Sequence, residues 1–253
     1  MDRHHTHPTH QSLIGFDFDG TLTPIVSHPE KVRVPKIVFS LLRKLQKKQG
    51  AHIFILSGRP LSYLKKLFPE NGFYLAGNHG FECEGPSLHY VHPQARQEAK
   101  HLQQIKKWLA PFLKKYSGVW LEDKKYTFSV HYRALPLSQH PLFCRALRAH
   151  LRSFPKGLKK IKLRPGKCVL EIRPQLNWDK GTFYLWLAKK LKLHPKKDFF
   201  FYAGDDVTDE DVFKAIEKLS GFTVYVGPAH HKTAATYRTE DTQSLIRLLM
   251  LFT

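Results

Sequence analysis

The feature that most constrains this chain is an apolar run that ends at two closely spaced carboxylates. Residues 13–16 are typical of a buried strand, Asp17 and Asp19 follow it, and Gly20 then turns the chain. Ligands collect at the carboxyl ends of strands in an open parallel sheet. Asp17 is therefore a candidate nucleophile, and Asp19 is a candidate general acid and base. The same residues are also common in turns, so the motif needs support from elsewhere.

Three later segments supply the other groups that phosphoryl transfer needs. A second apolar run, residues 51–56, ends at Ser57, and a helical pattern begins at Lys180. A third apolar run, residues 199–203, ends at an acidic cluster that contains Asp205, Asp206 and Asp209. The chain thus offers a hydroxyl, an ammonium and a second set of carboxylates, each beside a strand end or a helix start.

The order of the expected elements predicts an α/β fold with an insertion. Strands and helices alternate in residues 12–91 and 173–253, which is typical of a doubly wound, Rossmann-like core with a parallel sheet. Residues 92–172 instead show a helix and two strands, followed by another helix and two strands. We expect this segment to form an α+β cap that determines substrate specificity. Residues 1–11 are polar and rich in histidine, and we expect a flexible N-terminus.

Composition restricts the compartment and the partners. No apolar run approaches the length of a membrane span, the N-terminus has no signal-peptide core, and the three cysteines lie far apart. These features favour a cytoplasmic protein with no membrane partner. The net charge is +20, from 41 Lys and Arg against 21 Asp and Glu, but the basic residues are scattered in pairs. This pattern indicates a basic solvated surface that attracts anionic substrates, and nucleic-acid binding is not expected as the main role.

Phosphate monoesters are dianionic, so a carboxylate can attack them only if charge is neutralised. Clustered carboxylates would also repel one another. Mg²⁺ prefers oxygen ligands and would solve both problems. We expect its ligands to be Asp17, the Asp19 carbonyl, Asp205 and Asp206, with Asp209 in support, although the division between the last two stays open. Asp17 would then form an aspartyl phosphate.

In this mechanism Asp19 protonates the leaving oxygen and later deprotonates the hydrolytic water. Ser57 and Lys180 hold the phosphoryl oxygens and offset developing charge.

The motifs resemble two nested families. Their order resembles the haloacid dehalogenase-like phosphatases, and the segments in the cap resemble the trehalose-6-phosphate phosphatases within that superfamily. The resemblance extends over about residues 13–250 and rests on residues 16–22, 57–59, 77–80, 122–124, 131–133, 166–174 and 204–210. It implies an Mg²⁺-dependent hydrolase that converts trehalose 6-phosphate to trehalose and phosphate in trehalose biosynthesis.

The resemblance also implies a set of substrate-binding residues. Those in the cap, which would contact the sugars, are Glu122, Lys124, Arg133, Lys167 and Glu171. Those in the core are Gly20, Thr21, Gly58, Arg59, Asn78 and His79.

One departure from the family pattern concerns the residue before Lys180. Many relatives have Asn there, whereas this chain has Asp179, which could pair with the lysine and leaves the role of Asn177 open. Alternative functions are a phosphatase of another sugar phosphate, such as sucrose phosphate or mannosylglycerate phosphate, and a non-catalytic partner of a trehalose-phosphate synthase.

Overall fold

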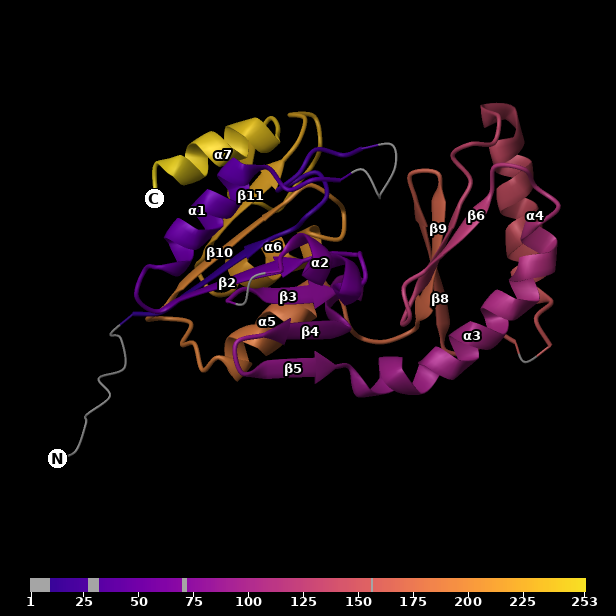
Figure 1. The fold of residues 1–253 in the computed structure, drawn as a ribbon, viewed down its shortest axis with the longest axis horizontal. Helices are drawn as coiled ribbons and strands as arrows, with labels where there is room; N and C mark the ends of the chain where they lie inside the picture. Colours follow the sequence, from indigo (N-terminus) through magenta and orange to yellow (C-terminus); the bar gives the residue numbers. More distant parts are fainter. Residues whose placement is uncertain (1–9, 27–31, 70–71, 156) are drawn as a thin grey trace. The chain divides into compact units, whose positions relative to one another are not determined.

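The computed structural model describes residues 10–26, 32–69, 72–155 and 157–253. The chain divides into two compact units, which we call the core (Met1–Tyr90 with Trp178–Thr253) and the cap (Val91–Asn177) (Figure 1). The predicted second boundary of the cap is residue 172. The observed boundary lies later because strand β9, Val169–Pro174, is paired throughout with other strands of the cap.

The core is built on one eight-stranded sheet in the order β12-β11-β10-β1-β2-β3-β4-β5. Neighbouring strands from β12 to β3 in this order are parallel, whereas β4 is antiparallel to β3. The strands are β1 (Ser12–Phe16), β2 (Ala51–Leu56), β3 (Tyr74–Gly77), β4 (Glu82–Gly85), β5 (Leu88–Val91), β10 (Phe199–Gly204), β11 (Phe222–Val226) and β12 (Tyr237–Thr239).

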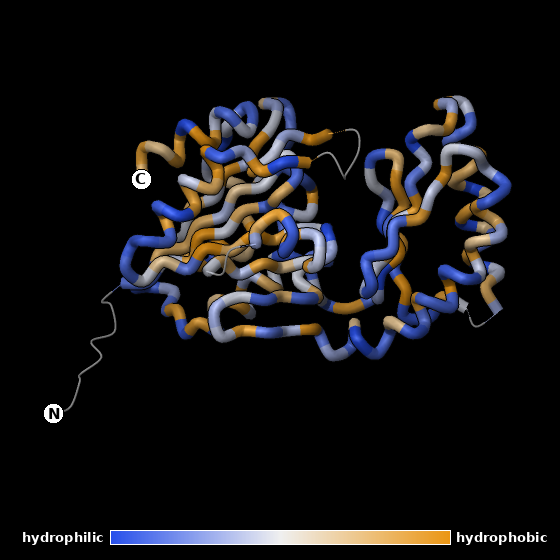
Figure 2. The backbone as a smooth tube through the Cα atoms, viewed as in Figure 1, coloured by the Kyte–Doolittle hydropathy of each residue, from blue (hydrophilic) through white to orange (hydrophobic). Residues whose placement is uncertain are grey.

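Helices cover both faces of this sheet. Side chains of α1 (Lys36–Gln46), α2 (Leu61–Leu67) and α7 (Thr242–Met250) pack in one hydrophobic cluster, and those of α5 (Lys180–Lys190) and α6 (Glu210–Glu217) pack in another. In β1, Leu13 joins the second cluster and Ile14 the first, because successive side chains of a strand point to opposite faces. Strands buried on both sides must be apolar almost throughout, and Figure 2 shows hydrophobic residues along the central strands. The predicted doubly wound α/β fold is confirmed.

The cap holds a four-stranded antiparallel sheet in the order β6-β7-β9-β8. Its other strands are β6 (Trp120–Asp123), β7 (Phe128–His131) and β8 (Ile161–Gly166). Apolar residues of one sheet face, including Val130 and Leu170, form a core with Leu109 of α3 (Pro93–Leu113) and Leu147 of α4 (His140–Arg152). The opposite face is therefore left to polar side chains.

The described segments also contain the short 3₁₀ helices η2 (Asn78–Gly80) in the core and η3 (Leu137–Gln139) in the cap. Residues 1–9 of the predicted flexible N-terminus lie outside the described residues. Gln11 belongs to the core, because its backbone NH donates to Asp198 and its carbonyl accepts from the backbone NH of Phe199.

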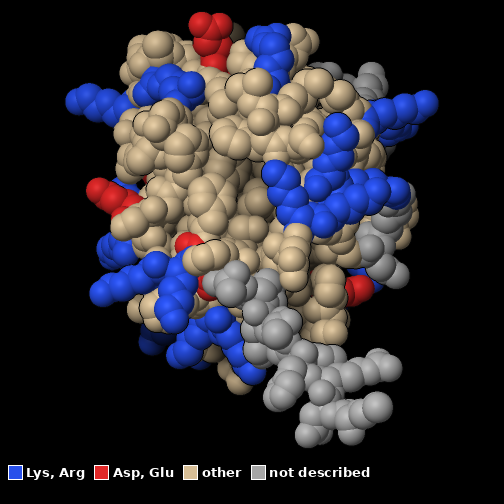
Figure 3. Space-filling model, turned by 90° about the vertical axis from the view of Figure 1, so that its left-hand side faces the viewer, with Lys and Arg blue, Asp and Glu red and all other residues tan. Residues whose placement is uncertain are grey.

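No helix in the described segments is long and apolar enough to cross a bilayer. On the face drawn in Figure 3, Lys and Arg are dispersed around a largely uncharged centre.

Candidate active site

The candidate site lies at the carboxyl ends of three neighbouring parallel strands. Asp17 directly follows β1, Ser57 follows β2, and Asp205 follows β10, which pair in the order β10-β1-β2. The backbone NH of Asp17 donates to the carbonyl of Ala203, the last residue but one of β10, over 2.8 Å. Side chains separated by up to 188 positions along the chain thus meet at one edge of the sheet, as expected for this fold.

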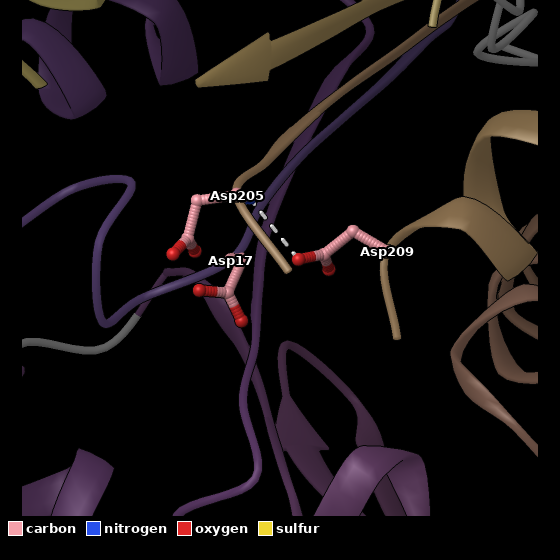
Figure 4. A group of neighbouring side chains, drawn as sticks. All are labelled: Asp17, Asp205 and Asp209. Carbon is pink, nitrogen blue, oxygen red and sulfur yellow. Dashed lines mark hydrogen bonds between the residues drawn. The ribbon is translucent and has the colours of Figure 1, made fainter. Parts of the chain in front are cut away.

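A lysine buried at the start of α5 joins two of the carboxylates. The Lys180 Nζ atom lies 2.6 Å from Asp17 Oδ1 and 2.7 Å from Asp209 Oδ1, and all three side chains are less than 10% exposed. Figure 4 shows the carboxylate of Asp17, which follows β1, close to those of Asp205 and Asp209, which both follow β10. Charge-assisted contacts of this length are strong when they are shielded from water.

Asp209 receives hydrogen bonds at both of its carboxylate oxygens. Oδ1 accepts from Lys180 and, over 2.7 Å, from the Tyr202 hydroxyl. Oδ2 accepts from the backbone NH groups of Asp205 and Asp206 at 3.2 and 3.0 Å. With four donors around it, this fully buried carboxylate holds the loop after β10 and the first turn of α5 together.

The cluster carries more negative than positive charge. Burial, together with the charges of Asp209 and Asp205, raises the pKa of Asp17 well above its ordinary value, although Lys180 opposes the shift. Burial and the charge of Asp209 likewise raise the pKa of Asp205 to about 7. Burial by itself would lower the pKa of the Lys180 ammonium, but the charges of Asp17 and Asp209 together have the larger effect and raise this pKa. One ammonium against three carboxylates leaves the site in need of further positive charge.

This deficit fits a divalent cation. One carboxylate oxygen from each of Asp17, Asp205 and Asp209 lies within 4.8 Å of the others, and oxygen donors of this kind are what Mg²⁺ prefers. Because the oxygens of Asp209 are already engaged by four donors, Asp17 and Asp205 are the better ligands. Asp206, predicted as a ligand, is exposed and contributes its backbone NH to Asp209, while its Oδ2 lies 3.4 Å from the Thr208 hydroxyl.

Asp19, the candidate acid and base, is held by Arg59. The guanidinium donates from Nε and Nη2 to the two carboxylate oxygens, over 2.8 and 2.7 Å. Such a bidentate pair fixes the orientation of the carboxylate. The guanidinium also lies over the ring of Tyr63, 5.0 Å from its centroid. Arg59, predicted to bind substrate, is therefore also a direct partner of Asp19.

The loop after β2 is tied to the loop after β3. The Ser57 hydroxyl accepts from the backbone NH of Arg59 at 3.1 Å, and the Ser57 carbonyl accepts from the NH of His79 at 2.9 Å. Asn78 and His79 both have positive φ, 50° and 56°, a conformation that is rare outside glycine and clusters at functional sites. A Cβ atom on Gly58 would lie 2.9 Å from the His79 ring, so a glycine there allows the two loops to approach.

Two further predicted residues lie against Asp205. The buried Thr21 hydroxyl donates to Asp205 Oδ1 over 3.2 Å. Gly20 has a φ of +91°, and a Cβ atom there would lie 2.1 Å from Asp205 Oδ2. Both residues therefore shape the position of this carboxylate.

In the cap, three of the predicted sugar-binding residues form a cluster on the polar sheet face. The Lys124 ammonium lies 3.8 Å from Glu122 and 3.9 Å from Glu171. Arg133 and Lys167 are exposed near the turn between β8 and β9, where Arg133 Nη2 lies 3.5 Å from the Lys167 carbonyl. The structure thus brings Glu122, Lys124 and Glu171 together, and it places the other two near one another at the sheet end.

Sequence reasoning missed several contacts of the site. The buried Glu82 accepts from Asn78 Nδ2 and from the backbone NH of Leu61, and nothing in the local pattern indicates that role. Tyr202 was assigned only to an apolar run, although its hydroxyl reaches Asp209. Asp179 does not pair with Lys180 in the described structure, because it caps α5 by accepting from the NH and hydroxyl of Thr182.

The chain is similar to known proteins over most of its length. The family model described as trehalose-phosphatase matches residues 15–243. Trehalose-phosphate phosphatase B of Arabidopsis thaliana is 31% identical over 94% of the chain, and trehalose 6-phosphate phosphatase RA3 of Zea mays is 31% identical over 91%. The chain spans 65% and 66% of the length of these two relatives.

Among solved structures, the C-terminal domain of the C. albicans trehalose-6-phosphate phosphatase aligns with a TM-score of 0.79 and 26% identity. The alignment covers 96% of this chain and 92% of that one.

Proposed function

Since the chain belongs to the trehalose-phosphatase family, we propose that it hydrolyses trehalose 6-phosphate to trehalose and phosphate. The observation that carries the proposal is the buried group of Asp17, Lys180, Asp205 and Asp209 at the carboxyl ends of adjacent strands. A structural salt bridge would need one carboxylate for one ammonium, whereas three carboxylates around one lysine are suited to a cation and a phosphoryl group.

Asp17 is the nucleophile in this proposal. One of its oxygens attacks phosphorus, the bond from phosphorus to the sugar oxygen breaks, and an aspartyl phosphate forms. The Lys180 ammonium already contacts Asp17 Oδ1. It can therefore stabilise the negative charge on the phosphoryl oxygens while Asp17 attacks. The Ser57 hydroxyl, at the end of the neighbouring strand, donates to another phosphoryl oxygen.

Asp17 and Asp205 would hold Mg²⁺, together with the Asp19 carbonyl. When bound, the ion supplies the positive charge that offsets the phosphate dianion and the clustered carboxylates. Thr21 and Gly20 keep Asp205 in place for this role. Asp209 supports the site through Lys180 and the loop after β10.

Asp19 protonates the leaving sugar oxygen and then takes a proton from the water that hydrolyses the aspartyl phosphate. In the structure both of its oxygens accept from Arg59, so a proton on Asp19 would cost at least one of these hydrogen bonds. We therefore assign Arg59 the role of fixing the orientation of the Asp19 carboxylate after it has given up the first proton and before it takes up the second.

The sugar part of the substrate is assigned to the polar sheet face of the cap. Glu122, Lys124 and Glu171 offer acceptors and donors within one small area, which suits the many hydroxyl groups of a disaccharide. Arg133 and Lys167 would add donors at the end of the sheet. Trehalose 6-phosphate presents such hydroxyl groups on both of its rings.

The test is phosphate release from a panel of disaccharide and monosaccharide phosphates, with Mg²⁺ and with EDTA, for the wild-type chain and an Asp17→Asn variant. We expect trehalose 6-phosphate to be preferred, EDTA to abolish turnover, and the variant to be inactive. Preference for sucrose phosphate or mannosylglycerate phosphate would replace the substrate assignment. A chain that binds trehalose 6-phosphate but releases no phosphate would instead indicate a non-catalytic partner of a trehalose-phosphate synthase.

A further inference from the structure

The polar sheet face of the cap also carries an exposed indole. Trp120 is 45% exposed at the start of β6, an edge strand of the cap sheet. It is paired in register with His131 of β7, and the two rings stack with centroids 3.9 Å apart and an interplanar angle of 6°. The imidazole therefore fixes the plane of the indole and covers part of it, while nearly half of the side chain remains open to solvent.

This indole borders the group of hydroxyl-binding side chains. The imidazole Nε2 of His131 lies 2.9 Å from Glu122 Oε2, and Glu122 is two residues from Trp120 and so on the same face of β6. Lys124 and Glu171 continue the group from Glu122. A flat apolar surface thus adjoins a set of carboxylates and an ammonium.

Packing within the cap does not account for this placement. The helices α3 and α4 pack against the opposite sheet face, where Val130 and Leu170 are buried. On the polar face, the indole of Trp120 lies outside the hydrophobic cluster of the cap. Here the neighbouring imidazole immobilises it, which lowers the entropy lost when a ligand binds.

A pyranose ring matches both parts of this surface. Its C–H groups form an apolar face that can lie on an indole, and its hydroxyl groups lie around the rim, where carboxylates and an ammonium can bind them. A small acyclic phosphate ester has no such face. We propose that Trp120, oriented by His131, is a specificity-determining platform for one glucose ring of the substrate. This inference rests on the proposed function and extends it to a residue outside the predicted site.

The matched pair of variants is Trp120→Leu and Trp108→Leu. Trp108 is also stacked on an imidazole, that of His150, with centroids 5.3 Å apart and an angle of 9°, but it belongs to the helical layer of the cap. Loss of a stacking surface for the sugar should raise KM for trehalose 6-phosphate about three- to tenfold in Trp120→Leu and leave kcat within about twofold. Trp108→Leu should keep both constants within about twofold. An unchanged KM in Trp120→Leu overturns the inference, and the proposed function is unaffected.

A second measurement is independent of turnover. Trehalose, added to the 253-residue chain, should shield an indole from acrylamide quenching in the wild type and in Trp108→Leu, and it should not do so in Trp120→Leu. If no phosphate is released and this shielding is nevertheless seen, the proposed function fails and the platform stands. If turnover is normal and trehalose shields the indoles equally in Trp120→Leu, the platform is refuted.

Discussion

The hydrogen bond between Tyr202 and Asp209 can be removed almost in isolation. Tyr202 is fully buried in β10, its ring packs against Phe54 and Phe213, and its hydroxyl donates to Asp209 Oδ1 over 2.7 Å. Burial raises the pKa of this phenol, and so does the charge of Asp209, so the hydroxyl remains a donor at any working pH. The substitution Tyr202→Phe keeps the ring and deletes only the donor.

We expect two measurable consequences of Tyr202→Phe. A hydrogen bond to a charged group contributes about 1.5–3 kcal/mol, so the free energy of unfolding should fall by about 2 kcal/mol. Lys180 shares the same oxygen and would be drawn toward Asp209, away from Asp17. We therefore expect kcat to fall about tenfold, with KM within about twofold, because the buried hydroxyl cannot touch the substrate.

The matched control is Tyr184→Phe, which lies in the same ring cluster. Its hydroxyl donates over 3.2 Å to the neutral carbonyl of Leu13, and such bonds contribute about 0.5–1.5 kcal/mol. Urea unfolding and steady-state kinetics of both variants provide the comparison. If Tyr202→Phe keeps wild-type kcat, or if both variants lose kcat equally, the hydroxyl does not position the lysine and the reasoning is wrong.

Three further outcomes are expected. Asp17→Asn should lower kcat by at least about 10³-fold while the melting temperature does not fall, since the substitution removes the nucleophile and a carboxylate that is short of compensating charge. The pKa of Asp205 is raised to about 7 in the protein without metal, so Mg²⁺ must displace a proton from this carboxyl below that pH. The affinity for Mg²⁺, measured by calorimetry, should therefore fall toward pH 6, and binding should release protons. Binding that does not depend on pH would contradict this. Gly20→Ala should weaken Mg²⁺ binding about tenfold or more, because its Cβ would meet Asp205 at a positive φ; unchanged affinity would count against Asp205 as a ligand.

The core was predictable because strand periodicity and sheet topology leave few choices. Three apolar runs predicted β1, β2 and β10 to within one or two residues, and the edge formed by their carboxyl ends then brought Asp17, Ser57 and Asp205 together. In the cap, Leu170 and Ile172 of β9 lie two residues apart and are both buried under the helices, as the two-residue period of a strand requires. The strand begins only at Val169, since Cys168 has a φ of 60° and belongs to the turn.

The sequence could not predict which side chains of the site form hydrogen bonds with one another. Asp205 and Asp206 are adjacent carboxylates in the loop after β10, and nothing in their order indicates that Asp206 is the exposed one. The bidentate pair of Arg59 with Asp19 joins residues 40 positions apart, and its formation depends on the loop geometry after two different strands. The four donors around Asp209 likewise come from three elements.

The chain enters the cap far from Asp17, measured along the sheet, and returns to the core close to Lys180. The chain leaves the core after β5, the last strand in the order β1-β2-β3-β4-β5, and re-enters just before α5. Strands β2, β3 and β4 therefore lie between β1 and β5, the strand after which the chain enters the cap. The whole insert could therefore be exchanged for another domain without re-pairing any strand that precedes Asp17, Ser57 or Asp205.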